Sequence, residues 1–135
     1  MPSRDAGHRL DRRPLDRAAR GVRAVLRQVV AVARNGEPVP TALLDLVERL
    51  SSACTLLAAD LAADRPLDDA VDALHSVARA SATVPRSSLP SDVILGQLRT
   101  TMVDLFQVAG LDVDESRARM PPPRGQHPLG DAPQD

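Results

Sequence analysis

Residues 41–64 read TALLDLVERLSSACTLLAADLAAD, and this stretch decides the fold. Its apolar residues recur at alternating steps of four and three: Leu43, Val47, Leu50, Cys54, Leu57 and Leu61. Such a heptad places one apolar stripe along a helix. Thr41 can cap the start of this helix, and Pro66 would stop it soon after residue 64. The pattern therefore predicts a helix over residues 41–64 that packs against other helices.

A second helix is predicted upstream, over residues 14–34. Pro14 suits a first helical turn, and Asn35-Gly36 suits a helix end. Apolar residues recur between them at steps of three and four: Leu15, Ala18, Val22, Val25 or Leu26, Val29 and Ala33. This spacing predicts one apolar face that packs on the rest of the molecule.

Two more helices are predicted downstream, over residues 67–81 and 91–109. The first carries Leu67, Val71, Leu74 and Ala78 along one line. In the second, Ser91 and Asp92 can cap the start and Gly110 can mark the end. Because residues 91–109 are apolar over most of the helix circumference, we expect this helix to be the most buried.

The predicted fold is all-α, an antiparallel four-helix bundle with a disordered, Pro-rich C-terminal tail. Residues 14–116 form the bundle, residues 1–13 are a flexible basic N-terminus, and residues 117–135 are the tail, which cannot bury a core. The link at residues 65–66 is so short that it predicts either a sharp corner or a kinked continuous helix. Composition agrees with helix, since Phe106 is the one aromatic residue and Ala and Leu dominate the apolar 43%.

The charge of the chain is unevenly distributed, although its net value is only −1. Residues 1–34 carry nine Arg against three Asp, a net of +6, whereas residues 35–115 carry five Arg against thirteen acids, a net of −8. The single cysteine, Cys54, excludes an internal disulfide and fits a reducing compartment. No apolar run approaches the roughly 20 residues of a membrane-spanning helix, so we expect a cytoplasmic chain.

The sequence offers no catalytic, cofactor or metal site that we can defend. His8, His75 and His127 have no second His or Cys three or four residues away, a spacing typical of zinc sites. Cys54 occupies a core position, where it acts as a small hydrophobe and not as a nucleophile. The acids of residues 60–72 are best explained as solvated side chains near a helix start. We therefore expect a non-enzymatic protein.

The basic stretch is the most informative polar feature. Five arginines share roughly one face of the helix predicted over residues 14–34: Arg13, Arg17, Arg20, Arg27 and Arg34. This face is either a solvated surface, partly neutralised by Asp45 and Glu48, or a surface held against an anionic membrane. Nucleic acid is not an expected partner, because the chain has no recognition module and no stacking aromatics.

Two segments resemble a known family. Residues 14–41 read PLDRAARGVRAVLRQVVAVARNGEPVPT, and residues 92–115 read DVILGQLRTTMVDLFQVAGLDVDE. Both resemble the C-terminal cytoplasmic region of bacterial fusaric-acid-resistance-type membrane proteins (the FUSC, or aromatic acid exporter, family). The matching positions of the second segment are Gln97, Arg99, Asp104, Leu105, Gly110, Leu111, Asp112, Asp114 and Glu115. Thr100 stands where Ser is common, Phe106 where Leu is common, and the family's membrane helices are missing.

The resemblance implies an accessory or assembly domain at the cytoplasmic, inner face of a membrane, in which Gln97, Arg99, Asp104 and Gly110 are structural or interfacial. From the residues alone, Arg99 and Asp104 either pair across helices or face solvent on the narrow polar strip of their helix, and we expect the strip. The alternative function is an independent helical interaction protein that homodimerises, which the wide apolar surface of residues 91–109 favours.

Overall fold

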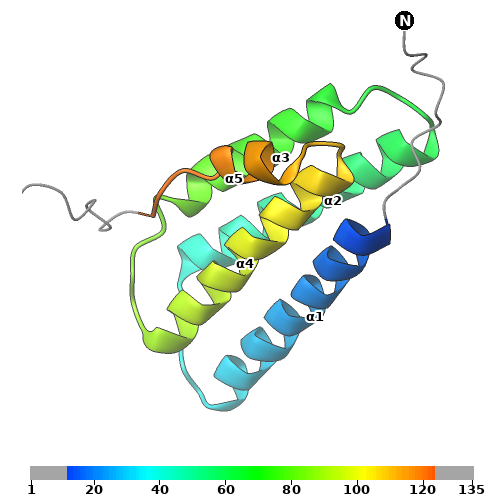
Figure 1. Ribbon diagram of the computed structural model, residues 1–135. Helices are drawn as coiled ribbons and strands as arrows, with labels where there is room; N and C mark the ends of the chain where they lie inside the picture. The colour runs from blue at the N-terminus through cyan, green and yellow to red at the C-terminus, as the bar shows by residue number, and fades with distance from the viewer. Residues whose placement is uncertain (1–11, 124–135) are drawn as a thin grey trace, which may run out of the picture.

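The computed structural model describes residues 12–123, and this part of the chain is all-helical, with no β-strand (Figure 1). Five helices pack together: α1 (Arg12–Arg34), α2 (Thr41–Ala62), α3 (Asp68–Ser81), α4 (Leu89–Val108) and α5 (Val113–Ala118). The four predicted helices are all present, and the all-α class is confirmed. Gly36 and Gly110, with φ of 71° and 101°, follow α1 and α4 in the left-handed conformation expected at a helix end.

Helix α4 is the centre of the fold, as its composition predicted. It contacts each of the other four helices, and Ile94, Met102 and Phe106 are completely buried. Helix α1 lies alongside α4 (Figure 1) and packs on it through Ala18, Gly21 and other small side chains. Helices α2 and α3 form a second pair, joined by a sharp corner.

The core stripe of α2 differs from the predicted heptad at every second position, where the buried residue is the one directly before the predicted one. Its buried residues are Leu43, Leu46, Leu50, Ala53, Leu57 and Asp60, while Val47, Cys54 and Leu61 are half-buried. Those three residues pack against the edge of the core and are not part of its buried centre. Leu46 and Ala53 are equally apolar and one position away, so the sequence pattern alone could not rank the two stripes.

The stripe of α1 is displaced in the same manner. Its buried residues are Pro14, Ala18, Gly21, Val25 and Val32, whereas Leu15, Val22, Leu26 and Val30 are exposed. The prediction that Leu15 and Val22 lie in the core was therefore wrong. The reason lies at Gly21, where a Cβ atom would overlap Thr101 Oγ1 and lie 3.3 Å from Thr101 Cβ. The Thr101 side chain of α4 occupies the space that a Cβ would need, so the absence of a side chain at Gly21 allows α1 to pack closely on α4 with this face.

The α2–α3 corner contains a buried acid. Asp60 accepts a hydrogen bond from Arg65 Nε at 3.0 Å, and its side chain is 8% exposed. The other acids of this corner, Asp64, Asp68, Asp69 and Asp72, are exposed, as predicted. The expectation of a solvated side chain was wrong for Asp60 alone.

The helix caps and the last helix differ from the predictions. Helix α4 starts at Leu89, because Ser88 Oγ accepts a hydrogen bond from Ser91 N, and Ser91 itself is buried. Asp112 caps α5 by accepting a hydrogen bond from Glu115 N at 2.8 Å. Because α5 includes Arg117 and Ala118, the prediction that the tail starts at residue 117 was wrong. Residues 1–11 and 124–135, where the rest of the predicted termini fall, lie outside the described residues.

Candidate functional site: an apolar groove between α1 and α2

Helices α1 and α2 leave a groove between them. Across their described lengths, no pair of Cα atoms from α1 and α2 lies within 8 Å, although both helices contact α4. The resulting groove has a volume of about 250 Å³. Its walls come from α1 and α2 and its floor from α4, with Val22, Val25, Leu26, Val47, Leu50, Ser51, Cys54, Leu98 and Thr101 lining it.

The walls of the groove hold the apolar residues that the core does not use. Val22 and Leu26 of α1 are 41% and 57% exposed, and Leu15 and Val30 continue the same row along the helix. On α2, the half-buried Val47 lines the groove and Leu44, three residues earlier, is exposed. Both stripes predicted from the sequence thus contain residues that are buried in the core and residues that lie beside the groove.

Cys54 lies on the α2 wall of this groove. Its side chain is half-buried, and burial raises the pKa of the thiol. A catalytic cysteine needs the opposite shift, because the thiolate is the nucleophile. The position therefore supports the predicted role of a small hydrophobe, although in a groove wall and not in the closed core.

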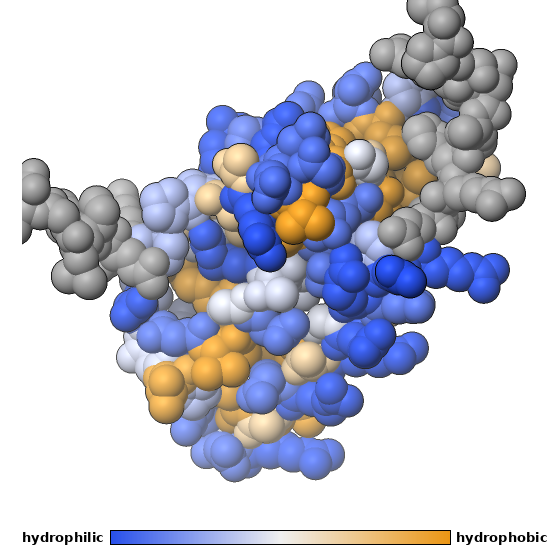
Figure 2. Space-filling model, in the orientation of Figure 1, coloured by the Kyte–Doolittle hydropathy of each residue, from blue (hydrophilic) through white to orange (hydrophobic). Residues whose placement is uncertain are grey.

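The two sides of the groove carry opposite charge. Helix α1 contains six Arg and one Asp besides Arg17, which pairs with Asp104, a net of +5. Helix α2 contains one Arg and two acids besides Asp60, which is buried and pairs with Arg65, a net of −1. Arg23 lies three residues before Leu26 on α1 and Arg27 follows it directly, whereas Glu48 lies one turn from Leu44 on α2, and all three charged residues are exposed. Figure 2 shows hydrophilic residues gathered along the outer side of α1.

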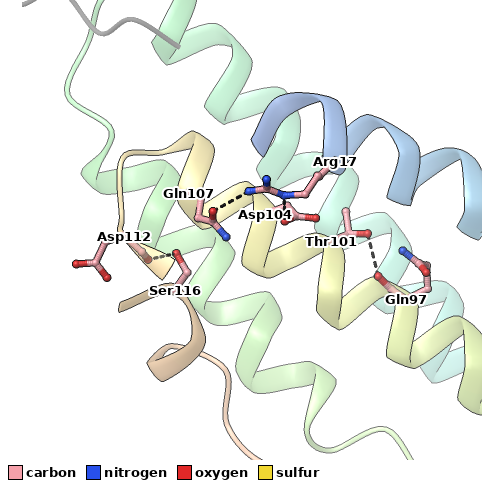
Figure 3. Close-up of polar contacts among 7 residues, drawn as sticks. All are labelled: Arg17, Gln97, Thr101, Asp104, Gln107, Asp112 and Ser116. Carbon is pink, nitrogen blue, oxygen red and sulfur yellow. Dashed lines mark hydrogen bonds and ion pairs between the residues drawn. The ribbon is translucent and has the colours of Figure 1, made fainter. Parts of the chain in front are cut away.

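The arginine face predicted from the sequence is present except at one position. Arg13, Arg20, Arg27 and Arg34 recur at steps of seven on the side of α1 turned away from α4, and all four are exposed. Arg17 instead turns toward α4. Its Nε donates to Asp104 Oδ1 at 3.1 Å and its Nη2 donates to Gln107 Oε1 at 2.9 Å (Figure 3).

These contacts correct the expectation for Asp104. Its side chain is 13% exposed and pairs across helices with Arg17, so it does not lie on a solvated strip. Sequence reasoning could not choose between the two options, because the partner is 87 residues away. The pair holds the N-terminal half of α1 on α4.

Arg99 also binds across elements, so the solvent-facing expectation was wrong here too. Its Nη1 donates to Ser81 Oγ at 2.7 Å, and its Nη2 donates to the carbonyl oxygen of Pro121. Burial lowers the pKa of the Arg99 guanidinium. This one side chain connects the end of α3, the middle of α4 and the segment that follows α5.

The remaining residues of the exporter-like motif have local roles. The backbone oxygen of Gln97 accepts a hydrogen bond from Thr101 Oγ1 at 2.8 Å (Figure 3). Ser116 Oγ donates to the backbone oxygen of Asp112 at 2.7 Å and is buried, which anchors α5 (Figure 3). Gly110 ends α4, as described above. These contacts are structural.

A polar hollow of about 440 Å³ lies beside the Arg17–Asp104 pair. The side chains of Arg17, Asp104 and Gln107 that line it bind one another. Among residues 12–123, no group of three or more His, Cys, Asp or Glu side chains is placed to hold a metal ion. His75 is half-buried on α3, and the positions of His8 and His127 fall outside the described range. Because its polar side chains bind one another, the hollow offers less to a ligand than the groove does.

Comparison with known proteins identifies no relative: no protein-family profile, curated protein or solved structure matches this chain. No helix within residues 12–123 is long and apolar enough to cross a membrane. The exporter resemblance consequently stays a prediction.

Proposed function

We propose that this protein is a non-enzymatic helical interaction module, an open antiparallel bundle that binds an amphipathic helix in the groove between α1 and α2. The observation that carries the proposal is the row of exposed apolar side chains on both walls, Leu26 above all. Fully burying a leucine side chain contributes about 1.5–3 kcal/mol, so covering these residues supplies a driving force for association.

The groove specifies the chemistry of its ligand. A helix with apolar residues at steps of three and four would fill the gap over Leu98 and Thr101. Acidic residues on the flank over α1 would meet Arg23 and Arg27, and basic residues on the other flank would meet Glu48. Such charges select the orientation of the ligand more than they add affinity.

Fluorescence anisotropy with a designed probe tests this proposal. The probe is a labelled peptide of about three heptads with Leu at both apolar positions, Glu on one flank and Lys on the other. The control peptide has the same composition in scrambled order. We expect the patterned peptide to bind and the scrambled peptide to bind much more weakly.

A matched pair of variants locates the binding site. Leu26→Gln should weaken peptide binding by about fivefold or more, because it replaces an apolar groove contact. Leu89→Gln makes the same change at an exposed leucine on α4, outside the groove, and should leave binding unchanged. Equal binding of both peptides, or no effect of Leu26→Gln, would contradict the proposal.

A second candidate function is an accessory domain at an anionic membrane surface, as the exporter resemblance implies. The exposed row of Arg20, Arg27 and Arg34 favours it, because juxtamembrane arginines contribute about 1 kcal/mol each near anionic lipid. Sedimentation with anionic and neutral vesicles at low and physiological salt tests it. Salt-sensitive binding to anionic vesicles alone is expected, and absence of binding at low salt would exclude this role.

A further inference from the structure

We infer that the face formed by α1 and α2, with the groove between them, is covered by a second copy of this chain, in a two-fold dimer that lays α1 of each copy on α2 of the other. The inference rests on the proposed function of the groove and names the chain that covers it. A dimer of this type requires a self-complementary surface, because every contact occurs twice.

The apolar part of this surface is self-complementary. Both α1 and α2 carry exposed apolar residues beside their core stripes, represented by Leu26 on α1 and Leu44 on α2. When two such faces meet, the apolar rows of each copy cover those of the other. The two grooves then face each other, and the apolar rows of the four helices meet between the copies.

Charge decides the direction of the two-fold axis. An axis along the groove places α1, with a net of +5 outside the Arg17–Asp104 pair, on α2 of the other copy, with a net of −1 outside the Asp60–Arg65 pair. An axis across the groove would instead place α1 on α1 and bring two highly basic helices together. Because these charges would face each other within the ~8 Å screening length at physiological salt, the first arrangement is strongly favoured.

The size of the face is adequate for a dimer. Helix α1 has 23 residues and α2 has 22. At a rise of about 1.5 Å per residue and a diameter of about 10 Å, the pair presents a face of about 34 by 20 Å, or roughly 700 Å². Stable protein interfaces cover about 800 Å² on each partner, so this face is of the right order.

The register of the dimer predicts a specific charge contact. Val22 and Leu26 lie level with Val47 and Ser51, since all four line one groove. Rotation about an axis along the groove does not shift the two copies along the helices. Arg23 of one copy therefore faces the turn of α2 that contains Glu48 in the other. The dimer would hold two such pairs, which its symmetry relates.

Sedimentation velocity of the full chain across about a hundredfold dilution tests the inference. We expect the wild type to be dimeric and to dissociate on dilution. Leu26→Gln, which occurs twice per dimer, should raise the dissociation constant by at least about tenfold. Leu89→Gln should dissociate as the wild type does, and circular dichroism should show that both variants retain their helix content.

Charge exchange tests the arrangement within the dimer. Arg23→Glu should raise the dissociation constant by roughly tenfold, because it creates two like-charge contacts. Adding Glu48→Arg to it should restore association to near the wild-type value. A double variant as weak as the single variant would overturn the α1-on-α2 arrangement.

The outcomes separate this inference from the proposed function. If the wild-type chain stays monomeric but binds the patterned peptide, the inferred dimer is overturned. The groove then remains a site for another protein's helix. If Leu26→Gln does not weaken the dimer, the groove is not the contact between the copies. A monomer that binds no patterned peptide overturns both.

Discussion

Leu50 and Leu26 line the same groove, yet their side chains are 5% and 57% exposed. Leu50→Ala should therefore lower the free energy of unfolding by about 2–5 kcal/mol, as a buried large-to-small change does. Leu26→Ala should lower the same free energy of the monomer by no more than about 0.5 kcal/mol. Urea unfolding, followed by circular dichroism at a concentration that keeps the copies apart, measures both. Equal losses would mean that α1 and α2 close over Leu26 and that no groove exists.

Two helical glycines have opposite surroundings, and their alanine variants should change stability in opposite directions. A Cβ at Gly21 would overlap Thr101, whereas a Cβ at Gly96 would have nothing within 4 Å. Gly21→Ala should cost about 1–3 kcal/mol of unfolding free energy through overpacking against α4. Gly96→Ala should add about 0.5–1 kcal/mol, because it removes backbone freedom from the unfolded chain. Thermal melts of the two variants provide the test, and an increase for both would contradict the close α1–α4 approach.

Cys54 reports on the groove through its reactivity. Because burial raises the pKa of this thiol, a smaller fraction is thiolate near neutral pH than for an exposed cysteine. Alkylation by iodoacetamide should be slower than in the urea-unfolded chain, and its rate should continue to rise at pH values where the unfolded chain has levelled off. Mass spectrometry of timed samples measures this. A rate and pH profile equal to those of the unfolded chain would contradict the half-buried position.

For the four long helices, the sequence predicted well where each one lies in the chain and predicted poorly which of its faces is buried. The steps of three and four located α1, α2, α3 and α4 to within a few residues, because long amphipathic helices carry a strong periodic signal. The same steps could not show which apolar residues face α4. In α2, for example, Leu46 and Val47 are neighbours of similar hydropathy, and only packing decides that Leu46 is buried.

Short elements and distant polar partners escaped the sequence reasoning for a different reason. Helix α5 has six residues, too few for a periodic pattern, and it depends on the Asp112 cap and the buried Ser116. The partners of Arg99 and Asp104 are set by tertiary structure. A charged residue on a mostly apolar helix was the available signal, and it is compatible with either a cross-helix pair or an exposed strip.

Arg99 connects three elements, and its loss should release the last of them. Arg99→Gln removes the hydrogen bond to the Pro121 carbonyl and weakens the one to Ser81, at a cost of about 1.5–3 kcal/mol. Limited trypsin digestion should then cut faster after Arg119, near the segment that Arg99 holds. Arg79→Gln, an exposed arginine in the last turn of α3, is the matched charge control. Equal cleavage of the two variants would show that Arg99 does not hold this segment.

At the scale of the whole molecule, composition and periodicity predicted the all-α class and the central position of α4. The separation of α1 from α2 could not be predicted, because it depends on how each of the two helices packs on α4, which the periodic pattern of either helix does not show. That separation leaves Val22 and Leu26 exposed beside the candidate site.

The central claim is that this groove binds an apolar helix face, whichever chain supplies it. Methyl-resolved NMR of the full chain, during titration with the patterned peptide and during dilution, tests it most directly. We expect chemical-shift changes at the methyl groups of Val22, Leu26 and Val47, with Leu74 and Ile94 in the completely buried core unaffected. Changes centred on Leu89 and Val93, or no changes in either experiment, would contradict it.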